Sequence, residues 1–151
     1  MPTASVDTEL GRLGVVEEED SIVRLLWSCP ERAPSTPLLT EAVRQLAAYF
    51  EGTLRTFELP LAPAGGEFQR RVCLAMSAIP FGETRTYGEL ATELDTSPQP
   101  LGNACGSNSI PILIPCHRVL SAKGLGGFSG DGGVDTKIRL LKHENAYPYL
   151  F

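Results

Sequence analysis

The sequence predicts an α+β protein built as a small N-terminal α/β domain followed by a C-terminal winged helix-turn-helix domain. Three observations indicate this class: short segments of alternating polarity in residues 4–28, apolar residues at helical spacing from residue 38 onward, and two short helices ahead of a glycine-rich stretch. Residues 52–66, which hold several prolines and glycines, are typical of a linker. We therefore expect one domain at residues 1–64 and another at residues 65–151.

The first domain is expected to open with a short antiparallel sheet. Residues 4–7, 11–16 and 21–27 alternate in polarity and are separated by turn residues. The acidic run at residues 17–20 lies between the last two expected strands, so we interpret it as a solvated hairpin loop. A metal site is disfavoured there, because no histidine or converging partner accompanies these carboxylates.

Three longer stretches repeat apolar residues at helical spacing. Residues 38–50 should form an amphipathic helix that stops at Gly52, and residues 67–79 and 134–143 should form two more. Cys73 lies beside the apolar stripe of the second stretch and is expected to be a small buried side chain. The buried faces expected of the first two helices are Leu39, Val43, Leu46, Ala47 and Phe50, and Phe68, Val72, Ala75, Met76 and Ile79.

Two shorter helices are predicted between these stretches. Thr86 and Glu89 have the spacing of a capping box, which opens the first short helix. A serine N-cap followed by proline then opens a second helix over residues 97–106. Two short helices joined by a tight turn suggest a helix-turn-helix motif, with residues 97–106 as its recognition helix. Residues 124–133 lack the Lys-Ser/Thr of a phosphate loop, so this glycine-rich stretch is expected to be a flexible wing.

Composition and charge narrow the classes of function. The four cysteines at positions 29, 73, 105 and 116 form no CxxC pair and have no regular spacing with histidine, so neither a zinc ribbon nor a disulfide framework is indicated. Free cysteines suit a reducing compartment, and we expect a cytoplasmic protein, nucleoid-associated in a bacterium or nuclear in a eukaryote. No signal peptide and no apolar run of about 20 residues is present, so no membrane association is expected.

The formal net charge of −5 is unevenly distributed. Residues 1–64 carry five arginines against ten acidic residues, whereas residues 65–151 carry eight basic and eight acidic residues. The acidity therefore belongs to the first domain. A neutral second domain can bind DNA only through a local cluster of cations and backbone amides, so we expect few phosphate contacts.

The candidate chemistry is centred on Cys116, in an apolar stretch of residues 110–120 that contains two prolines. The prolines favour an extended, buried arm over a helix. His117 and Arg118 follow the cysteine and should provide electropositive surroundings that lower the thiol pKa. Adjacent side chains diverge, so we expect His117 to reach Cys116 through a tight turn or a bridging water, with a third group orienting the imidazole.

The motif Pro115-Cys116-His117-Arg118-Val119, with Asn108 eight residues before the cysteine, resembles the active-site signature of the O6-alkylguanine-DNA alkyltransferases. The resemblance is strong over roughly the last ninety residues and loose over the first sixty. It implies a ribonuclease-H-like fold for the N-terminal domain and a winged helix-turn-helix for the C-terminal domain. Further motifs in the family's order lie at residues 79–84, 86–91, 127–130 and 137–144.

The resemblance implies direct-reversal DNA repair on double-stranded DNA that contains alkylated guanine. The lesion is rotated out of the stack, and its alkyl group passes from O6 to Cys116 by in-line displacement. His117 acts as the base through a water, and Glu144 orients His117 in a Cys-His-Glu relay. The thioether product resists hydrolysis, so each molecule reacts once, as a suicide enzyme. No metal or organic cofactor is needed, and we expect a monomer.

Further roles follow from the same resemblance. Tyr87 matches the tyrosine that supplies a proton or hydrogen bond to the leaving guanine, and Asn108 the residue that ties the recognition helix to the cysteine arm. On sequence alone, the alternatives are that Tyr87 is a core residue and Glu144 a solvated surface acid. The DNA-binding residues that we expect are Thr86, Gln99, Gly102, Arg118 and Ser129.

One departure from the family pattern bears on function. Gln99 stands where the family has an arginine that fills the gap left by the flipped base, and glutamine lacks its charge and reach. Two other functions remain open. The first is a protein that binds alkylated lesions without transferring the group, although binding alone needs no thiolate at Cys116. The second is a thiol-based sensor with a winged helix, for which Gln99 and the additional cysteines give some support.

Overall fold

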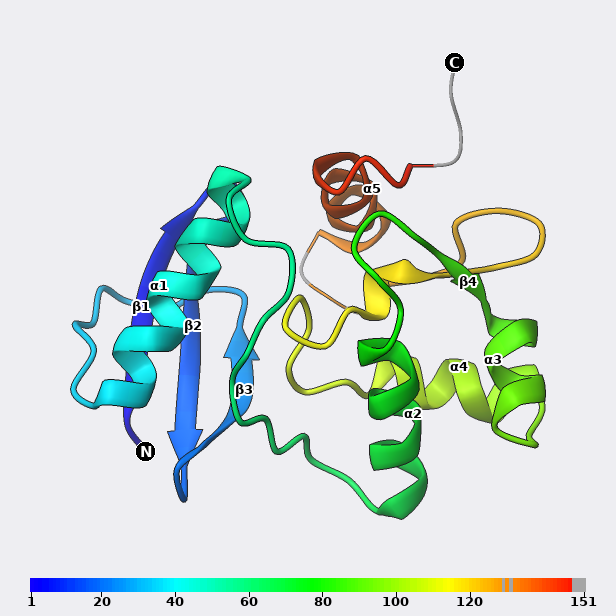
Figure 1. Cartoon of the computed structure of the whole chain (residues 1–151), viewed down its shortest axis with the longest axis horizontal. Helices are drawn as coiled ribbons and strands as arrows, with labels where there is room; N and C mark the ends of the chain where they lie inside the picture. Colours follow the sequence, from blue (N-terminus) through cyan, green and yellow to red (C-terminus); the bar gives the residue numbers. More distant parts are fainter. Residues whose placement is uncertain (129, 131, 148–151) are drawn as a thin grey trace. The chain divides into compact units, whose positions relative to one another are not determined.

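The computed structural model describes residues 1–128, 130 and 132–147, and the chain divides into two compact units, Met1–Pro63 and Ala64–Phe151 (Figure 1). No helix in the described part of the chain is long and apolar enough to span a membrane. The first unit is a three-stranded antiparallel sheet with one helix packed against it (Figure 1). Its elements are β1 (Thr3–Thr8), β2 (Gly11–Glu18), β3 (Ser21–Leu26) and α1 (Pro37–Glu51).

The predicted sheet is confirmed, but its acidic hairpin is tighter than expected. Only Glu19 and Asp20 form the turn, with φ angles of 50° and 63° in the left-handed region that a tight hairpin turn requires. Glu17 and Glu18 belong to β2. Glu17 is buried and accepts a hydrogen bond from the Thr36 hydroxyl, so this carboxylate supports the fold instead of being solvated.

Helix α1 has the predicted limits but a different buried face. Thr36 caps its start and Gly52, at φ 85°, ends it. Leu39 and Leu46 are buried as predicted, whereas Val43, Ala47 and Phe50 are only partly buried. The helix therefore buries a different face from the one that its apolar residues predict. The remaining buried positions are Ala42, Gln45 and Tyr49.

Much of the predicted linker is in fact part of the first unit. The Gln45 amide donates to the Glu58 carbonyl at 3.2 Å and accepts from the Glu58 N–H at 2.9 Å. Leu61 forms a parallel bridge with Ile22 of β3. Residues 58–62 therefore extend the edge of the sheet, because backbone hydrogen bonds fix a segment whose prolines and glycines suggested a free connection.

The second unit places the two short helices together, as predicted for a helix-turn-helix (Figure 1). Helix α3 packs on α4, and α2 packs on the other side of α4. Two short parallel strands, β4 and β5, join the start of α3 to the end of the arm. The elements are α2 (Glu67–Ser77), β4 (Arg85–Thr86), α3 (Tyr87–Glu93), α4 (Pro98–Gly106), η1 (Cys116–Arg118), β5 (Val119–Leu120) and α5 (Gly133–His143).

The helix starts follow the sequence signals with one exception. The capping box is present: the Thr86 hydroxyl accepts from the Glu89 N–H at 3.0 Å, and the Glu89 carboxylate accepts from the Thr86 N–H at 2.8 Å. Ser97 is the N-cap of α4 by backbone geometry, but its side chain makes no capping hydrogen bond. Cys73 is buried in α2, as predicted.

The predicted wing follows β5. Ser121 and Gly124 close a small turn, and the segment then continues without regular structure to Phe128. Ser129 and Asp131 lie outside the described residues. Gly126 has a φ of 73°, and a Cβ atom there would lie 2.8 Å from Cε2 of Tyr87, so glycine is needed for the wing to approach α3.

Candidate active site

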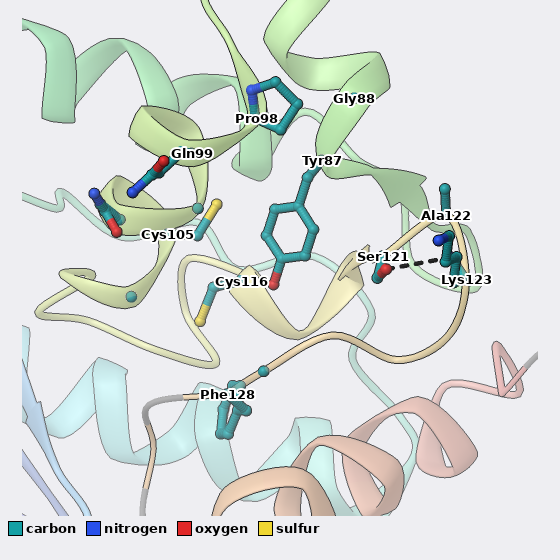
Figure 2. Close-up of a pocket in the computed structure, with 14 residues that line it drawn as sticks. Tyr87, Gly88, Pro98, Gln99, Cys105, Cys116, Ser121, Ala122, Lys123 and Phe128 are labelled. Atoms are coloured by element: carbon teal, nitrogen blue, oxygen red, sulfur yellow. Dashed lines mark hydrogen bonds between the residues drawn. The ribbon is translucent and has the colours of Figure 1, made fainter.

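A cavity of about 890 Å³ lies in the second unit, with Cys116 in its lining (Figure 2). Its walls are the start of α3, one face of α4, the η1 turn and the segment after β5. Figure 2 shows Tyr87 directing its hydroxyl toward the turn that carries Cys116, with Phe128 on the other side of the cavity. The cavity therefore brings together the predicted recognition helix, the predicted nucleophile and the wing.

The arm that ends at Cys116 is buried along its whole length, as the two prolines predicted. Every residue from 110 to 120 is buried. Ile112, a β-branched residue, has a φ of 73°, a conformation that costs about 1–3 kcal/mol and persists only where the surroundings fix it. The Ile114 N–H bonds to the Ile110 carbonyl at 2.9 Å and closes this bend. The arm then ends in the 3₁₀ turn η1, which the extended prediction did not include.

Glu144 is the acceptor at the centre of a buried network behind Cys116. His117 Nε2 lies 2.8 Å from Glu144 Oε2, and Arg118 donates from Nε to Oε1 at 2.8 Å and from Nη2 to Oε2 at 2.9 Å. Burial alone would raise the pKa of Glu144, but the hydrogen bonds from His117 and Arg118 outweigh it and lower the pKa to about 2. Glu144 is therefore an ionised interior carboxylate and not a solvated surface acid.

Arg118 is not available to DNA, so its predicted role in DNA binding is wrong. Its side chain is buried, and its remaining donor Nη1 bonds to the Ile79 carbonyl at 2.6 Å. The η1 turn is the physical reason, because it directs the Arg118 side chain inward onto Glu144. The sequence alone did not decide the orientation of Arg118, because a positive charge next to a reactive cysteine can face either the interior or the DNA.

His117 is held as a neutral imidazole. Burial lowers its pKa, and Glu144 only partly opposes this effect. With the carboxylate as its partner, Nε2 carries the proton, so Nδ1 is left with a free lone pair. Among the described residues, Nδ1 is buried without a hydrogen-bond partner. His117 thus presents an unprotonated nitrogen while Glu144 fixes the ring.

The surroundings of the Cys116 thiol differ from those predicted. Burial raises the pKa of Cys116 to about 11, opposed by a hydrogen bond from the Asn108 side chain and by the charge of Lys137. The prediction that His117 and Arg118 lower the thiol pKa is wrong, because one is neutral and the other is paired with Glu144. The free protein therefore holds Cys116 as a thiol and requires a base to activate it.

Asn108 connects α4 to the arm. Its Nδ2 donates to the Ile114 carbonyl at 2.9 Å, its Oδ1 accepts from the Ile110 N–H at 3.0 Å, and its own N–H bonds to the Cys105 carbonyl at 3.3 Å. The side chain also hydrogen-bonds the Cys116 thiol. One residue thus fixes the end of the recognition helix, the bend of the arm and the sulfur, which is the connection that the resemblance implied.

Tyr87 is half-buried and lines the cavity, so it is not simply a core residue. Burial raises the pKa of its hydroxyl to about 12, which keeps the proton on the oxygen at neutral pH. It is therefore a hydrogen-bond donor to whatever occupies the cavity beside Cys116.

Lys137 is a site residue that the sequence analysis missed. It is fully buried, and its ammonium donates to the carbonyls of Val119 at 2.6 Å and Gly127 at 3.0 Å. Burial lowers its pKa to about 8. The signal was present in the sequence, because Lys137 lies three and four residues before Leu140 and Leu141, on the apolar face of α5.

Comparison with known proteins agrees with this arrangement along the whole chain. A family model described as "6-O-methylguanine DNA methyltransferase, DNA binding domain" matches residues 67–146, and one described as the "ribonuclease-like domain" of the same methyltransferase matches residues 1–63. The chain belongs to this family. Membership confirms the predicted fold class, a ribonuclease-like N-terminal domain followed by a C-terminal DNA-binding domain.

Relatives of known name cover nearly the whole chain. A protein named methylated-DNA–protein-cysteine methyltransferase in Mycolicibacterium paratuberculosis is 39% identical, over 95% of this chain and 92% of that protein. A Bacillus subtilis protein named as the constitutive methylated-DNA–protein-cysteine methyltransferase is 37% identical, over 89% of this chain and 88% of that protein. A crystal structure of Mycobacterium tuberculosis OGT in complex with DNA is 35% identical, with a TM-score of 0.84 over 96% of this chain and 93% of that chain.

The other predicted DNA-binding residues differ in their placement. Gln99, in the first turn of α4, is exposed, and both Gln99 and Gly102 line the cavity. A Cβ atom on Gly102 would meet nothing within 4 Å, so this face of α4 is open to a partner. The Thr86 hydroxyl is used for capping α3, and Ser129 lies outside the described residues. In the described part of the chain, no group of three or more potential ligand side chains could hold a metal ion.

Proposed function

We propose that this chain repairs DNA directly by transferring the alkyl group of O6-alkylguanine to Cys116. The observation that carries the proposal is the position of Cys116, which lines a cavity beside the recognition helix and is followed in the chain by His117, whose imidazole is paired with buried Glu144. Membership of the methyltransferase family supports the reaction class, and the exposed face of α4 supports DNA as the partner.

The reaction needs the thiol proton to leave as the carbon–sulfur bond forms. Cys116 attacks the alkyl carbon, the bond from that carbon to O6 breaks, and its electron pair stays on the guanine. His117 receives the thiol proton at Nδ1, directly or through a water, and ionised Glu144 stabilises the imidazolium that results. Tyr87, protonated at neutral pH, donates a hydrogen bond to the departing guanine.

The stability of the thioether formed at Cys116 explains why each protein molecule acts only once. A thioether has no carbonyl or other group at which water attacks easily, so alkylated Cys116 is not regenerated. The burial of Cys116, which is 6% exposed in the free protein, adds to this effect because it limits the access of water. We propose a monomer that acts on alkylated guanine in double-stranded DNA in the cytoplasm or its nucleoid, and in the nucleus if the source is a eukaryote.

Intact-protein mass spectrometry tests the proposal. After incubation with a duplex that contains O6-methylguanine, the protein should gain the mass of one methyl group and no more. Trypsin should place the gain in residues 86–118, which contain Cys116, and a Cys116→Ser protein should gain nothing. A protein that binds the duplex with no change in mass would instead be a lesion-binding protein or a sensor. Methylation that persists in Cys116→Ser would exclude Cys116 as the acceptor.

A further inference from the structure

Two thiols, not one, line the cavity at the active site. All four cysteines are free and lie in the described part of the chain, but only Cys105 and Cys116 line this cavity (Figure 2). Cys73 is buried in α2 outside the lining, and Cys29 belongs to the first unit. The function proposed above uses Cys116 and leaves the Cys105 thiol without a role.

Asn108 and a nearby charge link the two cysteine residues. The Asn108 backbone N–H bonds to the Cys105 carbonyl at 3.3 Å, and its side chain favours the ionised form of the Cys116 thiol. Burial raises the pKa of both thiols, and the charge of the Lys137 ammonium opposes this effect at each of them. Cys105 and Cys116 therefore share one polar connection and one nearby cation, an arrangement that a filler cysteine in an apolar core would not have.

Small molecules can reach both sulfurs through the cavity, although neither is exposed to bulk solvent. The exposed fractions are 5% for Cys105 and 6% for Cys116, and both residues line a cavity that the wing covers on one side. A low-molecular-weight hydroperoxide is small enough to enter such a cavity.

We propose that Cys105 and Cys116 form a site of reversible oxidative modification, at which a small hydroperoxide converts the two thiols to a disulfide. The Cys116 sulfur attacks the peroxide, the O–O bond breaks, and Cys116 becomes a sulfenic acid while the peroxide is reduced to an alcohol or water. The Cys105 sulfur then attacks the sulfenic sulfur and displaces water. Two thiols lose two electrons and two protons, and the peroxide gains both.

The disulfide protects the acceptor. A sulfenic acid without a neighbouring thiol proceeds to sulfinic acid, which thiol reductants do not reverse. Capture by Cys105 stops this progress, and reduction restores Cys116 for alkyl transfer. The proposal does not depend on alkyl transfer, because the modification is read from the mass of the protein alone.

Peptide mass mapping after peroxide treatment tests the site. The sequence has no Lys or Arg between Arg85 and Arg118, so trypsin leaves Cys105 and Cys116 in one peptide, residues 86–118, and Cys73 in another, residues 72–85. After treatment with hydrogen peroxide and blocking of free thiols, peptide 86–118 should lose two hydrogens and resist blocking, and dithiothreitol should reverse both changes. A Cys73→Ser protein is the matched control and should behave as the wild type.

Replacement of Cys105 gives the decisive comparison. In Cys105→Ser, peptide 86–118 should gain oxygen at Cys116 and not recover with dithiothreitol. Cys105→Ala serves the same purpose if the serine protein does not fold. Equal and irreversible oxidation of Cys116 in the wild type and in either variant would overturn the proposal. A disulfide that joins peptides 72–85 and 86–118 would overturn it as well, because it would identify Cys73 as the partner.

Discussion

At the scale of single residues, Glu144 determines how the site is organised. It accepts hydrogen bonds from His117 and from two nitrogens of Arg118, and all three side chains are buried. A buried ion pair contributes little net stability compared with apolar packing, but removal of one partner leaves the other charge without compensation. The same carboxylate therefore supports both the imidazole that activates Cys116 and the fold of the second unit.

Replacement of Glu144 by Gln should affect both properties. Arg118 would lose its counter-charge, so the free energy of unfolding should fall by about 3–5 kcal/mol. Single-turnover methyl transfer should slow, because a neutral amide no longer stabilises protonated His117, whereas the affinity for a lesion-containing duplex should stay within a few-fold. The control is Glu83→Gln, since the Glu83–Arg85 pair is exposed and such pairs contribute about 1 kcal/mol or less. An unchanged transfer rate would remove Glu144 from the mechanism.

Gly126 allows a second prediction at the residue scale. Its φ of 73° and the 2.8 Å that would separate an added Cβ from the Tyr87 ring mean that Gly126→Ala must displace the tyrosine ring or the wing. Methyl transfer should therefore slow, because the Tyr87 hydroxyl leaves its place beside Cys116. Gly124→Ala is the matched control, since a Cβ there meets nothing within 4 Å. Single-turnover rates of the two variants measure the effect, and equal rates would show that Tyr87 adjusts without loss.

At the scale of the elements, the sequence was most informative where local rules apply. The strands and the capping box of α3 were predicted because turn chemistry and capping act within a few residues. The burial of the arm was also predicted, but its extended conformation was not, because Ile112 at φ 73° and the Ile114–Ile110 hydrogen bond close a bend there. The buried face of α1 and the position of residues 58–62 were not, because both depend on Gln45, a polar residue buried by its contacts with Glu58. A binary apolar pattern has no signal for a polar residue whose partner lies elsewhere in the chain.

In the candidate site, too, local patterns predicted some features and contacts with distant parts of the chain determine the others. Most of its residues were predicted from the motif, but Lys137 and the directions of the side chains were not. The 3₁₀ turn η1 directs Arg118 inward, and the Lys137 ammonium is buried by two backbone carbonyls that belong to β5 and the wing. The contacts of the two cations show that Glu144 neutralises Arg118, whereas the charge of Lys137 acts on the Cys116 thiol.

Helix α4 carries the departure from the family pattern that bears on function, which is Gln99 in place of an arginine. Gln99 is exposed in its first turn and lines the cavity, where an arginine would fill the gap left by a flipped base. Wedging a side chain into the stack must offset an unstacking cost of about a few kcal/mol per step, and glutamine does so without charge attraction. The extrahelical state of the lesion should therefore be less populated with this chain than with an arginine at the same position.

Gln99→Arg should accelerate repair of duplex DNA selectively. The deficit of the wild type should nearly vanish for free O6-benzylguanine or a single-stranded substrate, where no base has to be flipped. The measurement is the ratio of the duplex rate constant to the free-base rate constant in the two proteins. An equal ratio would mean that another residue acts as the wedge. A faster reaction of Gln99→Arg with the free base would place Gln99 in the pocket instead.

At the scale of the whole molecule, the number of basic residues in the sequence overestimates the number of cations that DNA can contact. Residues 65–151 carry eight basic residues, but Arg118 and Lys137 are buried and used internally. The acidic excess of the chain lies in residues 1–64. Of the eight basic residues, therefore, at most six are left for phosphate contacts.

The buried network also sets how stability depends on pH. The folded-state pKa of His117 is lowered by burial, and that of Glu144 is lowered to about 2 by its hydrogen bonds despite burial. The unfolded chain therefore binds more protons than the folded one at each group, so stability is lost as the pH falls. His117 should lower the free energy of unfolding below about pH 6.5, and Glu144 should lower it again between about pH 4.5 and 2.

Hydrogen exchange of the α5 backbone amides measures this effect in the second unit alone. Protection should decline in two steps as the pH falls, once the intrinsic pH dependence of exchange is subtracted. In His117→Asn the first step should disappear, because no imidazole remains to be protonated, while the step below about pH 4.5 should persist through Glu144 and Arg118. If protection in the wild type instead rises as the pH falls from above neutral toward about pH 6.5, His117 is already protonated in the folded state at neutral pH. It then has no lone pair at Nδ1 to receive the Cys116 proton, and the relay requires another base.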